Sequence, residues 1–189
     1  RVLVRHVAFS FALAAALVGV PMAVQATGGV APPSHHDRPV ELRHRLVVQE
    51  GEAAVALTLD ACGGGYDAEL VDTLVEWRVP ATVFVTRKWI ARHPQAMARL
   101  LAHPDLFAIE DHGARHVPAV VGAGKRVYGL AGVPDLEALR EEVSGGARAI
   151  TEAGAPHPGW YRGATAQYDR QALAAIESMG YRVAGFSVN

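Results

Sequence analysis

Four polar side chains follow four apolar runs that are expected to form strands. Asp60, His112, Arg162 and Asn189 each stand at the carboxyl end of such a run or just beyond it. In folds with parallel strands, the carboxyl ends of the strands meet at one rim, where ligands bind and catalytic groups gather. We therefore expect these four side chains to share a site. Their joint placement supports this more strongly than any one of them does alone.

Two of the histidines in the chain are spaced for a metal ion. Residues 112–116 read HGARH, so His112 and His116 are four residues apart. One helical turn or a tight loop of this length would bring both imidazoles to the same side, within reach of one ion at about 2.0–2.1 Å per nitrogen. The chain has nine histidines, so the spacing could also arise by chance. The strand-end position, with Asp111 and Pro118 nearby, favours a metal site.

Asp60 and Arg162 form a second candidate pair. Asp60 follows the apolar residues 57–59, so its carboxylate is expected at the edge of the core. An ionised group there needs a partner, a metal or a role as a base. The permanently charged Arg162 is suited to hold that carboxylate in one orientation. The alternative is that Asp60 only begins a turn, because Cys62 and three glycines follow it.

Three further side chains near these positions have two interpretations each. Trp160 and Tyr161 directly precede Arg162 and could stack on a sugar ring as substrate-binding residues, although such aromatic residues are more often part of a core. Cys62 could be a soft ligand or a nucleophile. Because no pattern in the sequence indicates an activated thiol, we interpret Cys62 as a small, partly buried residue that shapes the turn.

The apolar periodicity predicts alternating strands and helices that would position these residues. Repeated βα units of this kind require right-handed crossovers and a parallel sheet covered by helices. A glycine-rich stretch over residues 117–134 is too irregular for either element, and the last strand would be left as an uncovered edge. Strands are expected at 53–59, 81–86, 106–109, 159–162 and 181–188, and helices at 67–77, 94–103, 135–153 and 170–179.

The amino terminus predicts export. Arg1, Arg5 and His6 precede an apolar stretch at residues 7–20, and Pro21 and small residues near Ala26 follow it. This is the layout of a secretory signal peptide at residues 1–26, although an uncleaved anchor could just span a bilayer. A polar linker at 27–45 and one domain at 46–189 complete the expected organisation. We expect a periplasmic or secreted protein without stable membrane association after cleavage.

Composition excludes two classes of protein. Lys and Arg number 18 against 19 Asp and Glu, without a long basic run, which argues against nucleic-acid binding. A single cysteine excludes a framework of intramolecular disulfides. Half of the residues are hydrophobic, enough for a packed core.

The ordered set of these segments resembles the polysaccharide deacetylases, the NodB-homology carbohydrate esterases. The resemblance runs from about residue 53 to the end of the chain, with motif order and spacing in agreement. No single motif is specific, but the ordered set is. The matching segments are residues 55–60 (VALTLD), His112 and His116 with Pro118, residues 160–162 (WYR), and residues 181–189 (YRVAGFSVN).

The resemblance implies an α/β fold of the incomplete, distorted (β/α) barrel type and hydrolysis of acetyl groups on a glycan. In this family a divalent metal, usually zinc, polarises the acetyl carbonyl and activates a water. Carried over to this chain, His112 and His116 would be metal ligands, Asp60 the general base, and Arg162 the residue that orients Asp60.

Two departures from the family pattern limit what the resemblance implies. The family has two consecutive aspartates, the base and then a metal ligand, whereas Ala61 follows Asp60 here. The third ligand would have to be Asp60 itself, Asp67 or the Cys62 thiolate. The family also takes a general-acid histidine from a strand beyond its fourth motif, and no histidine follows Arg162 here. We therefore expect the domain to be incomplete at Asn189, with little or no activity as it stands.

The resulting prediction is an exported, metal-dependent hydrolase of non-peptide C–N bonds that deacetylates a carbohydrate. Its expected cofactor is a divalent metal, with zinc favoured, and its expected partner is an acetylated glycan. The sequence leaves two alternatives open. One is a catalytically impaired relative that binds glycan through aromatic residues at the rim, and the other is a C–N hydrolase of a small molecule.

Overall fold

The structure is a computed structural model that describes residues 38–44, 47, 50 and 54–187. The predicted signal peptide, residues 27–37 of the predicted linker, and Asn189 lie outside the described residues. None of the helices in the described part has the length and apolar character that a bilayer crossing requires.

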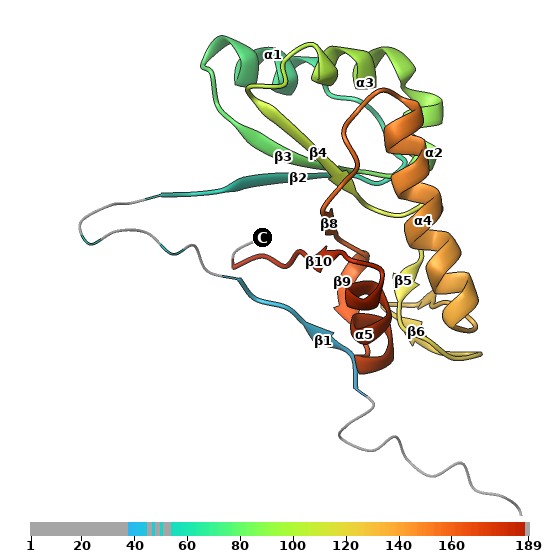
Figure 1. The fold of residues 1–189 in the computed structure, drawn as a ribbon. Helices are drawn as coiled ribbons and strands as arrows, with labels where there is room; N and C mark the ends of the chain where they lie inside the picture. The colour runs from blue at the N-terminus through green and yellow to red at the C-terminus, as the bar shows by residue number, and fades with distance from the viewer. Residues whose placement is uncertain (1–37, 45–46, 48–49, 51–53, 188–189) are drawn as a thin grey trace, which may run out of the picture. The chain divides into compact units, whose positions relative to one another are not determined.

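A five-stranded parallel sheet organises the fold (Figure 1), with the spatial order β10-β8-β4-β3-β2. Chain order and spatial order agree, as the predicted series of βα units requires. The two outer strands, β2 and β10, do not pair with each other, so the sheet has the predicted form of an incomplete (β/α) barrel. The strands are β2 (Leu57–Ala61), β3 (Ala81–Val85), β4 (Phe107–Asp111), β8 (Trp160–Tyr161) and β10 (Arg182–Val183).

Four of the five described helices begin where the sequence supplies a side chain that accepts a hydrogen bond from the first turn, and α3 instead begins at Pro94. Asp67, Asp135 and Asp169 cap α1, α4 and α5 in this way. Thr86, which we had placed at the end of a strand, caps a short helix that the sequence did not predict. The helices are α1 (Ala68–Glu76), α2 (Arg87–Arg92), α3 (Pro94–Leu101), α4 (Leu136–Glu152) and α5 (Arg170–Ser178).

The buried apolar side chains form two clusters. The first core fills the space between α1–α3 and β2–β4 and includes Val71, Leu74, Val83, Val85, Trp89, Met97, Leu100, Phe107 and Ile109. The second core lies between α4, α5 and the later strands and includes Val133, Leu139, Val143, Tyr161, Tyr168, Ile176 and Val183. Most of the apolar stripe predicted along α4 is buried in these two cores, because its period matches the helical repeat.

A smaller sheet corrects two predictions. Its order is β1-β9-β5, formed by β1 (Val40–Glu41), β9 (Ala164–Tyr168) and β5 (Pro118–Ala119). Strand β1 lies within the predicted linker, so the fold begins earlier than residue 46. The stretch at 117–134 was predicted to be irregular, yet it holds β5 and the hairpin of β6 (Arg126–Val127) and β7 (Leu130–Ala131). These strands escaped prediction because two residues cannot establish an alternating pattern.

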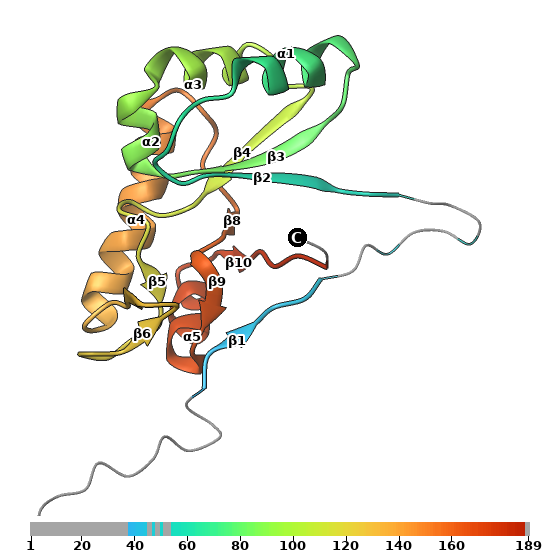
Figure 2. The ribbon, with the colours of Figure 1, turned by 180° about the vertical axis from the view of Figure 1, so that it is seen from behind.

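The segment of residues 38–44, which carries β1, lies along the β10 edge of the large sheet. Figures 1 and 2 both show the segment that carries β1 running beside the carboxyl-terminal segment. The Nε2 atom of His44 donates to the carbonyl oxygen of Val183 at 3.1 Å. A Cβ on Gly185 would lie 1.9 Å from the carbonyl oxygen of Leu42, so the two segments pack closely. The expectation of an uncovered last strand is therefore corrected.

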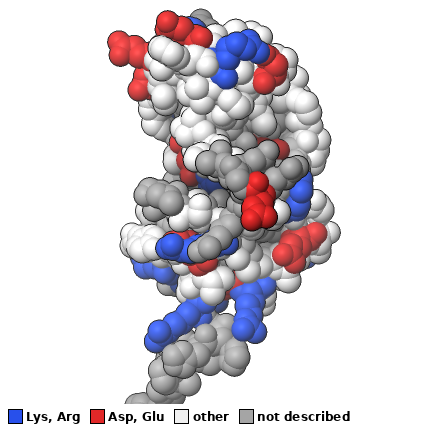
Figure 3. All heavy atoms as spheres, turned by 90° about the vertical axis from the view of Figure 1, so that its left-hand side faces the viewer, with Lys and Arg blue, Asp and Glu red and all other residues white. Residues whose placement is uncertain are grey.

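Charges of both signs share the molecular surface. On the face in Figure 3, the described Lys and Arg side chains occur together with Asp and Glu rather than in one extended field. Among the described residues of this face, no extended basic stripe of the kind with which proteins track a phosphate backbone is present.

Candidate functional site

The two faces of β2 have different partners. Leu57, Leu59 and Ala61 pack against the first core. Thr58 and Asp60 alternate with them, so their side chains point to the other face of the sheet. Asp60 lies inside the strand, paired in register with Phe84, rather than after the strand as the sequence predicted. The carboxylate therefore stands on a fixed backbone ladder, and its side chain keeps 35% exposure.

Arg162 binds Asp60, as the sequence analysis anticipated for this pair. Its Nη1 atom donates to Asp60 Oδ1 at 2.9 Å and to Thr58 Oγ1 at 3.0 Å, and its Nη2 atom donates to the carbonyl oxygen of Gly185 at 3.0 Å. The guanidinium carbon lies 4.2 Å from the centre of the Phe84 ring. Arg162 is almost fully buried, so this cation has one fixed position beside the carboxylate.

The main chain of Arg162 orients His112. His112 follows β4 directly, and its Nδ1 atom lies 2.5 Å from the carbonyl oxygen of Arg162. Because a carbonyl oxygen only accepts, Nδ1 must carry the proton and Nε2 must present its lone pair. A backbone carbonyl that fixes a histidine tautomer in this way is a common support for metal-binding imidazoles.

The loop after β4 brings His116 back towards His112. Two main-chain N–H groups of this loop, from Arg115 and Val117, donate to Glu142 Oε1 of α4 at 2.8 Å and 3.1 Å. His116 has a positive φ of 66°, which turns the chain sharply. The centres of the two imidazole rings are 4.8 Å apart. The predicted histidine pair is therefore brought together by a folded loop rather than by a helical turn.

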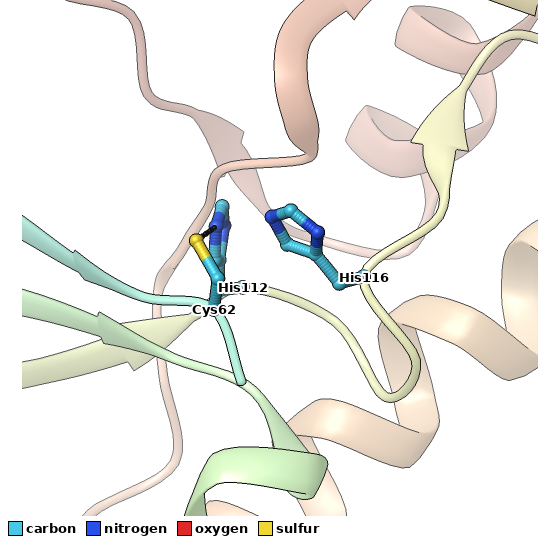
Figure 4. A group of neighbouring side chains, drawn as sticks. All are labelled: Cys62, His112 and His116. Carbon is cyan, nitrogen blue, oxygen red and sulfur yellow. Dashed lines mark hydrogen bonds between the residues drawn. The ribbon is translucent and has the colours of Figure 1, made fainter. Parts of the chain in front are cut away.

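Cys62 joins the two histidines (Figure 4). Its Sγ atom lies 3.4 Å from His112 Nε2, and the candidate ligand atoms of Cys62, His112 and His116 all lie within 4.8 Å of one another. We had interpreted Cys62 as a residue that shapes the turn, and its thiol instead faces the histidines. The signal in the sequence was its position two residues after Asp60, since alternate residues of a strand share a face.

The three donor atoms fit a divalent metal. A tetrahedral ion with bonds of about 2.0–2.3 Å to nitrogen and sulfur separates neighbouring donors by roughly 3.3–3.8 Å. The distance from Cys62 Sγ to His112 Nε2 falls in this range, and the widest separation in the cluster would close with a shift of about 1 Å. Two imidazoles and one thiol are also the donors that zinc prefers.

Burial favours the neutral imidazoles that metals bind. Desolvation lowers the pKa of His112, whereas the charge of Asp60 and the hydrogen bond to the Arg162 carbonyl oppose this effect. Desolvation also lowers the pKa of His116, against opposing effects of Asp60 and Glu142. Burial raises the pKa of the Cys62 thiol, and the charge of Asp60 adds to this effect. Both histidines are therefore ready to accept a cation, whereas the thiol needs a cation to lose its proton.

The two predicted substrate-binding aromatic residues face opposite ways. Tyr161 is completely buried in the second core, so it cannot stack on a sugar, and this prediction is corrected. Trp160 is partly exposed, with the guanidinium of Arg182 4.1 Å from the centre of its ring and His44 against its edge. The sequence alone does not indicate which of two successive strand residues faces the core.

Comparison of the chain with known proteins gives one family and one fold. The family model described as polysaccharide deacetylase matches residues 48–184. No curated protein matches the chain significantly.

Several solved structures share the fold. A family 4 carbohydrate esterase from Bacillus anthracis is 26% identical, with a TM-score of 0.54 over 68% of this chain and 57% of that chain. A family 4 carbohydrate esterase from Streptomyces lividans, in complex with acetate, is 19% identical, with a TM-score of 0.54 over 68% of this chain and 60% of that chain. A family 4 pseudoenzyme from Bacillus anthracis is 13% identical, with a TM-score of 0.55 over 71% of this chain and 43% of that chain.

The chain thus spans less than two thirds of the length of these solved relatives. The family match nevertheless extends from before β2 to the end of β10, and so includes Asp60, Cys62, His112, His116 and Arg162. On this match, the chain belongs to the polysaccharide deacetylase family.

Proposed function

We propose that this chain is the catalytic part of an exported, metal-dependent hydrolase that removes acetyl groups from a glycan. Family membership supports hydrolysis of a non-peptide C–N bond in general. The observation that carries the finer proposal is the Asp60–Arg162 pair on the same side of the sheet as the convergent His112 and His116.

The residues of the site divide the work of acetyl hydrolysis. A divalent metal held by His112 and His116 would supply Lewis-acid polarisation of the acetyl carbonyl and of the attacking water. Asp60 would accept the proton of that water as the carbonyl carbon is attacked. Arg162 would keep the carboxylate aimed, because its guanidinium occupies only Oδ1 in the hydrogen bonds described. The acetyl C–N bond would then break, and the glycan amine would leave with the proton that Asp60 had accepted from the water.

Substitution of Asp60 by asparagine tests the assignment of the base. Asparagine keeps the size of the side chain and an oxygen that can accept from Arg162, but it cannot take a proton at neutral pH. In a full-length, active version of the protein, we expect Asp60→Asn to reduce acetate release from an acetylated chito-oligosaccharide by at least about a hundredfold, in keeping with the usual contribution of a general base. Metal content, measured by elemental analysis, should stay equal to that of the unchanged protein. Loss of metal together with activity would make Asp60 a ligand and overturn its role as base.

A glycan-binding relative without activity is the second candidate. Ala61 stands where the resemblance places the family's second aspartate, and its side chain packs against the first core instead of entering the site. If the unchanged protein bound acetylated chito-oligosaccharides but released no acetate with zinc present, this candidate would replace the first. Acetate release from small acetylated amines, without release from oligosaccharides, would favour the third class, a small-molecule C–N hydrolase.

The proposal of export rests on the sequence alone. The basic residues before the apolar stretch at 7–20, and the small residues near Ala26, support cleavage by a signal peptidase. The mature protein should then begin near Thr27 in the periplasm or the medium. Amino-terminal sequencing of the protein recovered outside the cytoplasm checks this, and cytoplasmic protein that retains residues 7–20 would contradict it.

A further inference from the structure

The carboxylate that is lost at position 61 has a neighbour that can take its place. Ala61 faces the first core, and Cys62 is the next residue along the chain. Because side chains alternate along an extended chain, Cys62 returns to the face that Asp60 occupies. We propose that the Cys62 thiolate is the third protein ligand of the metal, together with His112 and His116. The proposal deepens the proposed function and rests on its metal dependence.

The other two candidates for a third ligand are already engaged. Asp67 caps helix α1, where its carboxylate accepts from the main-chain N–H of Leu70 at 3.0 Å. Asp60 accepts from Arg162 at 2.9 Å, and proton transfer needs its remaining oxygen. Among the residues that the structure describes, Cys62 is the one whose donor atom is within 4.8 Å of the ligand atoms of both histidines. Geometry and chemistry therefore select the same residue.

Four side chains hold the segment that carries the thiol. The hydroxyl of the fully buried Thr86 donates to the carbonyl oxygen of Cys62 at 2.5 Å. The next three residues are glycines, and each of their carbonyl oxygens bonds to one side chain of α2 or of the residue after it. These side chains are Arg92 on Gly63, His93 on Gly64 and Trp89 on Gly65. The thiol therefore has a supported position and is not at the tip of a free loop.

A cysteine and two histidines make a different site from a carboxylate and two histidines. The thiol releases its proton to solvent when the metal binds. The three protein ligands together then carry one negative charge, as two histidines and a carboxylate would. Thiolate favours zinc, cobalt or Fe²⁺ over hard ions such as Mg²⁺ or Ca²⁺. Three protein donors leave the fourth tetrahedral position for water or substrate, which is the arrangement of catalytic rather than structural zinc.

Cobalt reports directly on a thiolate ligand. Cobalt(II) bound by a thiolate absorbs in the near ultraviolet through sulfur-to-metal charge transfer, whereas cobalt(II) bound only by imidazole and carboxylate does not. We expect the full chain to bind one cobalt ion and to show this band. Cys62→Asp should bind cobalt without the band, because a carboxylate replaces the thiolate. Cys62→Ser should lose the band and bind zinc at least about tenfold more weakly.

Alkylation gives a second readout that needs no activity. Cys62 is the only cysteine of the chain, so incorporation of iodoacetamide counts this thiol alone. Zinc should slow alkylation of the unchanged protein by at least about tenfold, and it should give no protection when His112 and His116 are both alanine. Circular dichroism of each variant shows whether it is folded, and Cys62→Ala, which only removes the sulfur, serves as the second variant.

The outcomes separate this inference from the proposed function. Stoichiometric cobalt without the band, and alkylation that zinc does not slow, would overturn Cys62 as a ligand while the histidine site stands. Absence of bound cobalt in the unchanged protein would overturn both. A band that persists with both histidines replaced would show that cobalt binds Cys62 elsewhere, and would also overturn the inference.

Discussion

The two cores hold their chain in place by different means. Around the first core, β2, β3 and β4 pair over five residues each, and charged pairs such as Arg78–Asp105 lie at the surface. Around the second core, β8 and β10 pair over only two residues. There, buried carboxylates such as Glu142 and Asp169 accept hydrogen bonds from the main chain of distant segments. Where few backbone hydrogen bonds join the strands, buried side chains hold the segments together instead. Single substitutions there should therefore lower the free energy of unfolding more than substitutions around the first core.

The largest expected difference is between two glycines. A Cβ at Gly146, in α4, would lie 2.0 Å from Asp111 Oδ1 and 2.8 Å from the carbonyl carbon of Gly113, whereas a Cβ at Gly64 has no atom within 4 Å. Gly146→Ala should therefore cost at least about 2 kcal/mol of unfolding free energy, despite the better helix propensity of alanine. Gly64→Ala should change it by less than about 0.5 kcal/mol. Urea denaturation measures both, and equal losses would contradict the comparison.

Removal of Glu142 should have the next largest effect. Its carboxylate is fully buried and accepts from two main-chain N–H groups and from Arg115 Nε. Glu142→Ala leaves these part-buried donors without their acceptor, which should cost about 1–2 kcal/mol. The matched variant is Asp105→Ala, which removes the exposed partner of Arg78 and should leave stability unchanged within error. Thermal unfolding of the two variants, measured side by side, tests this difference. A similar loss of stability in both would show that the buried carboxylate contributes no more than the exposed one.

The smallest expected difference in stability is between substitutions of two buried tyrosines of the second core. The Tyr168 hydroxyl accepts from the main-chain N–H of Gly163 at 2.9 Å, whereas the Tyr161 hydroxyl has no partner among the described protein atoms. Tyr168→Phe should cost about 1 kcal/mol, and Tyr161→Phe should cost less or stabilise the fold. The urea midpoint of Tyr168→Phe should therefore be lower than that of Tyr161→Phe. The reverse order would mean that the Tyr161 hydroxyl has a stabilising role that the structure does not show.

The sequence predicted the longer helices and the large parallel sheet better than the small sheet, for a physical reason. Helices α1, α3, α4 and α5 were predicted because apolar periodicity is a local signal. The parallel order of the sheet follows from the alternation of elements. Strands β1, β5 and β9 depend on partners far away in the chain, and β9 includes Thr165 and Ala166 at positive φ, which no strand pattern anticipates.

The sequence identified most residues of the candidate site, but it did not show which of them lie next to one another in space. Asp60, His112, His116 and Arg162 could be named because polar residues at strand ends are conspicuous among apolar ones. Cys62 resembled a turn residue because the glycines after it dominate the local pattern. Its proximity to His112 depends on how β2 and β4 are spaced in the sheet, which no local signal encodes.

Arg162 serves the site through two chemically separate groups. Its guanidinium holds Asp60, and its carbonyl oxygen holds His112. A scan of alanine substitutions deletes only the first group, because every amino acid brings the same carbonyl. Such a scan would identify Arg162 as the partner of the carboxylate and would overlook its bond to the imidazole. To see that bond, one must edit the main chain itself, by replacing the amide between Arg162 and Gly163 with an ester, whose carbonyl is a poorer acceptor. The ester also removes the Gly163 N–H that donates to the Tyr168 hydroxyl, so the edit is made in the Tyr168→Phe background, where that bond is already absent.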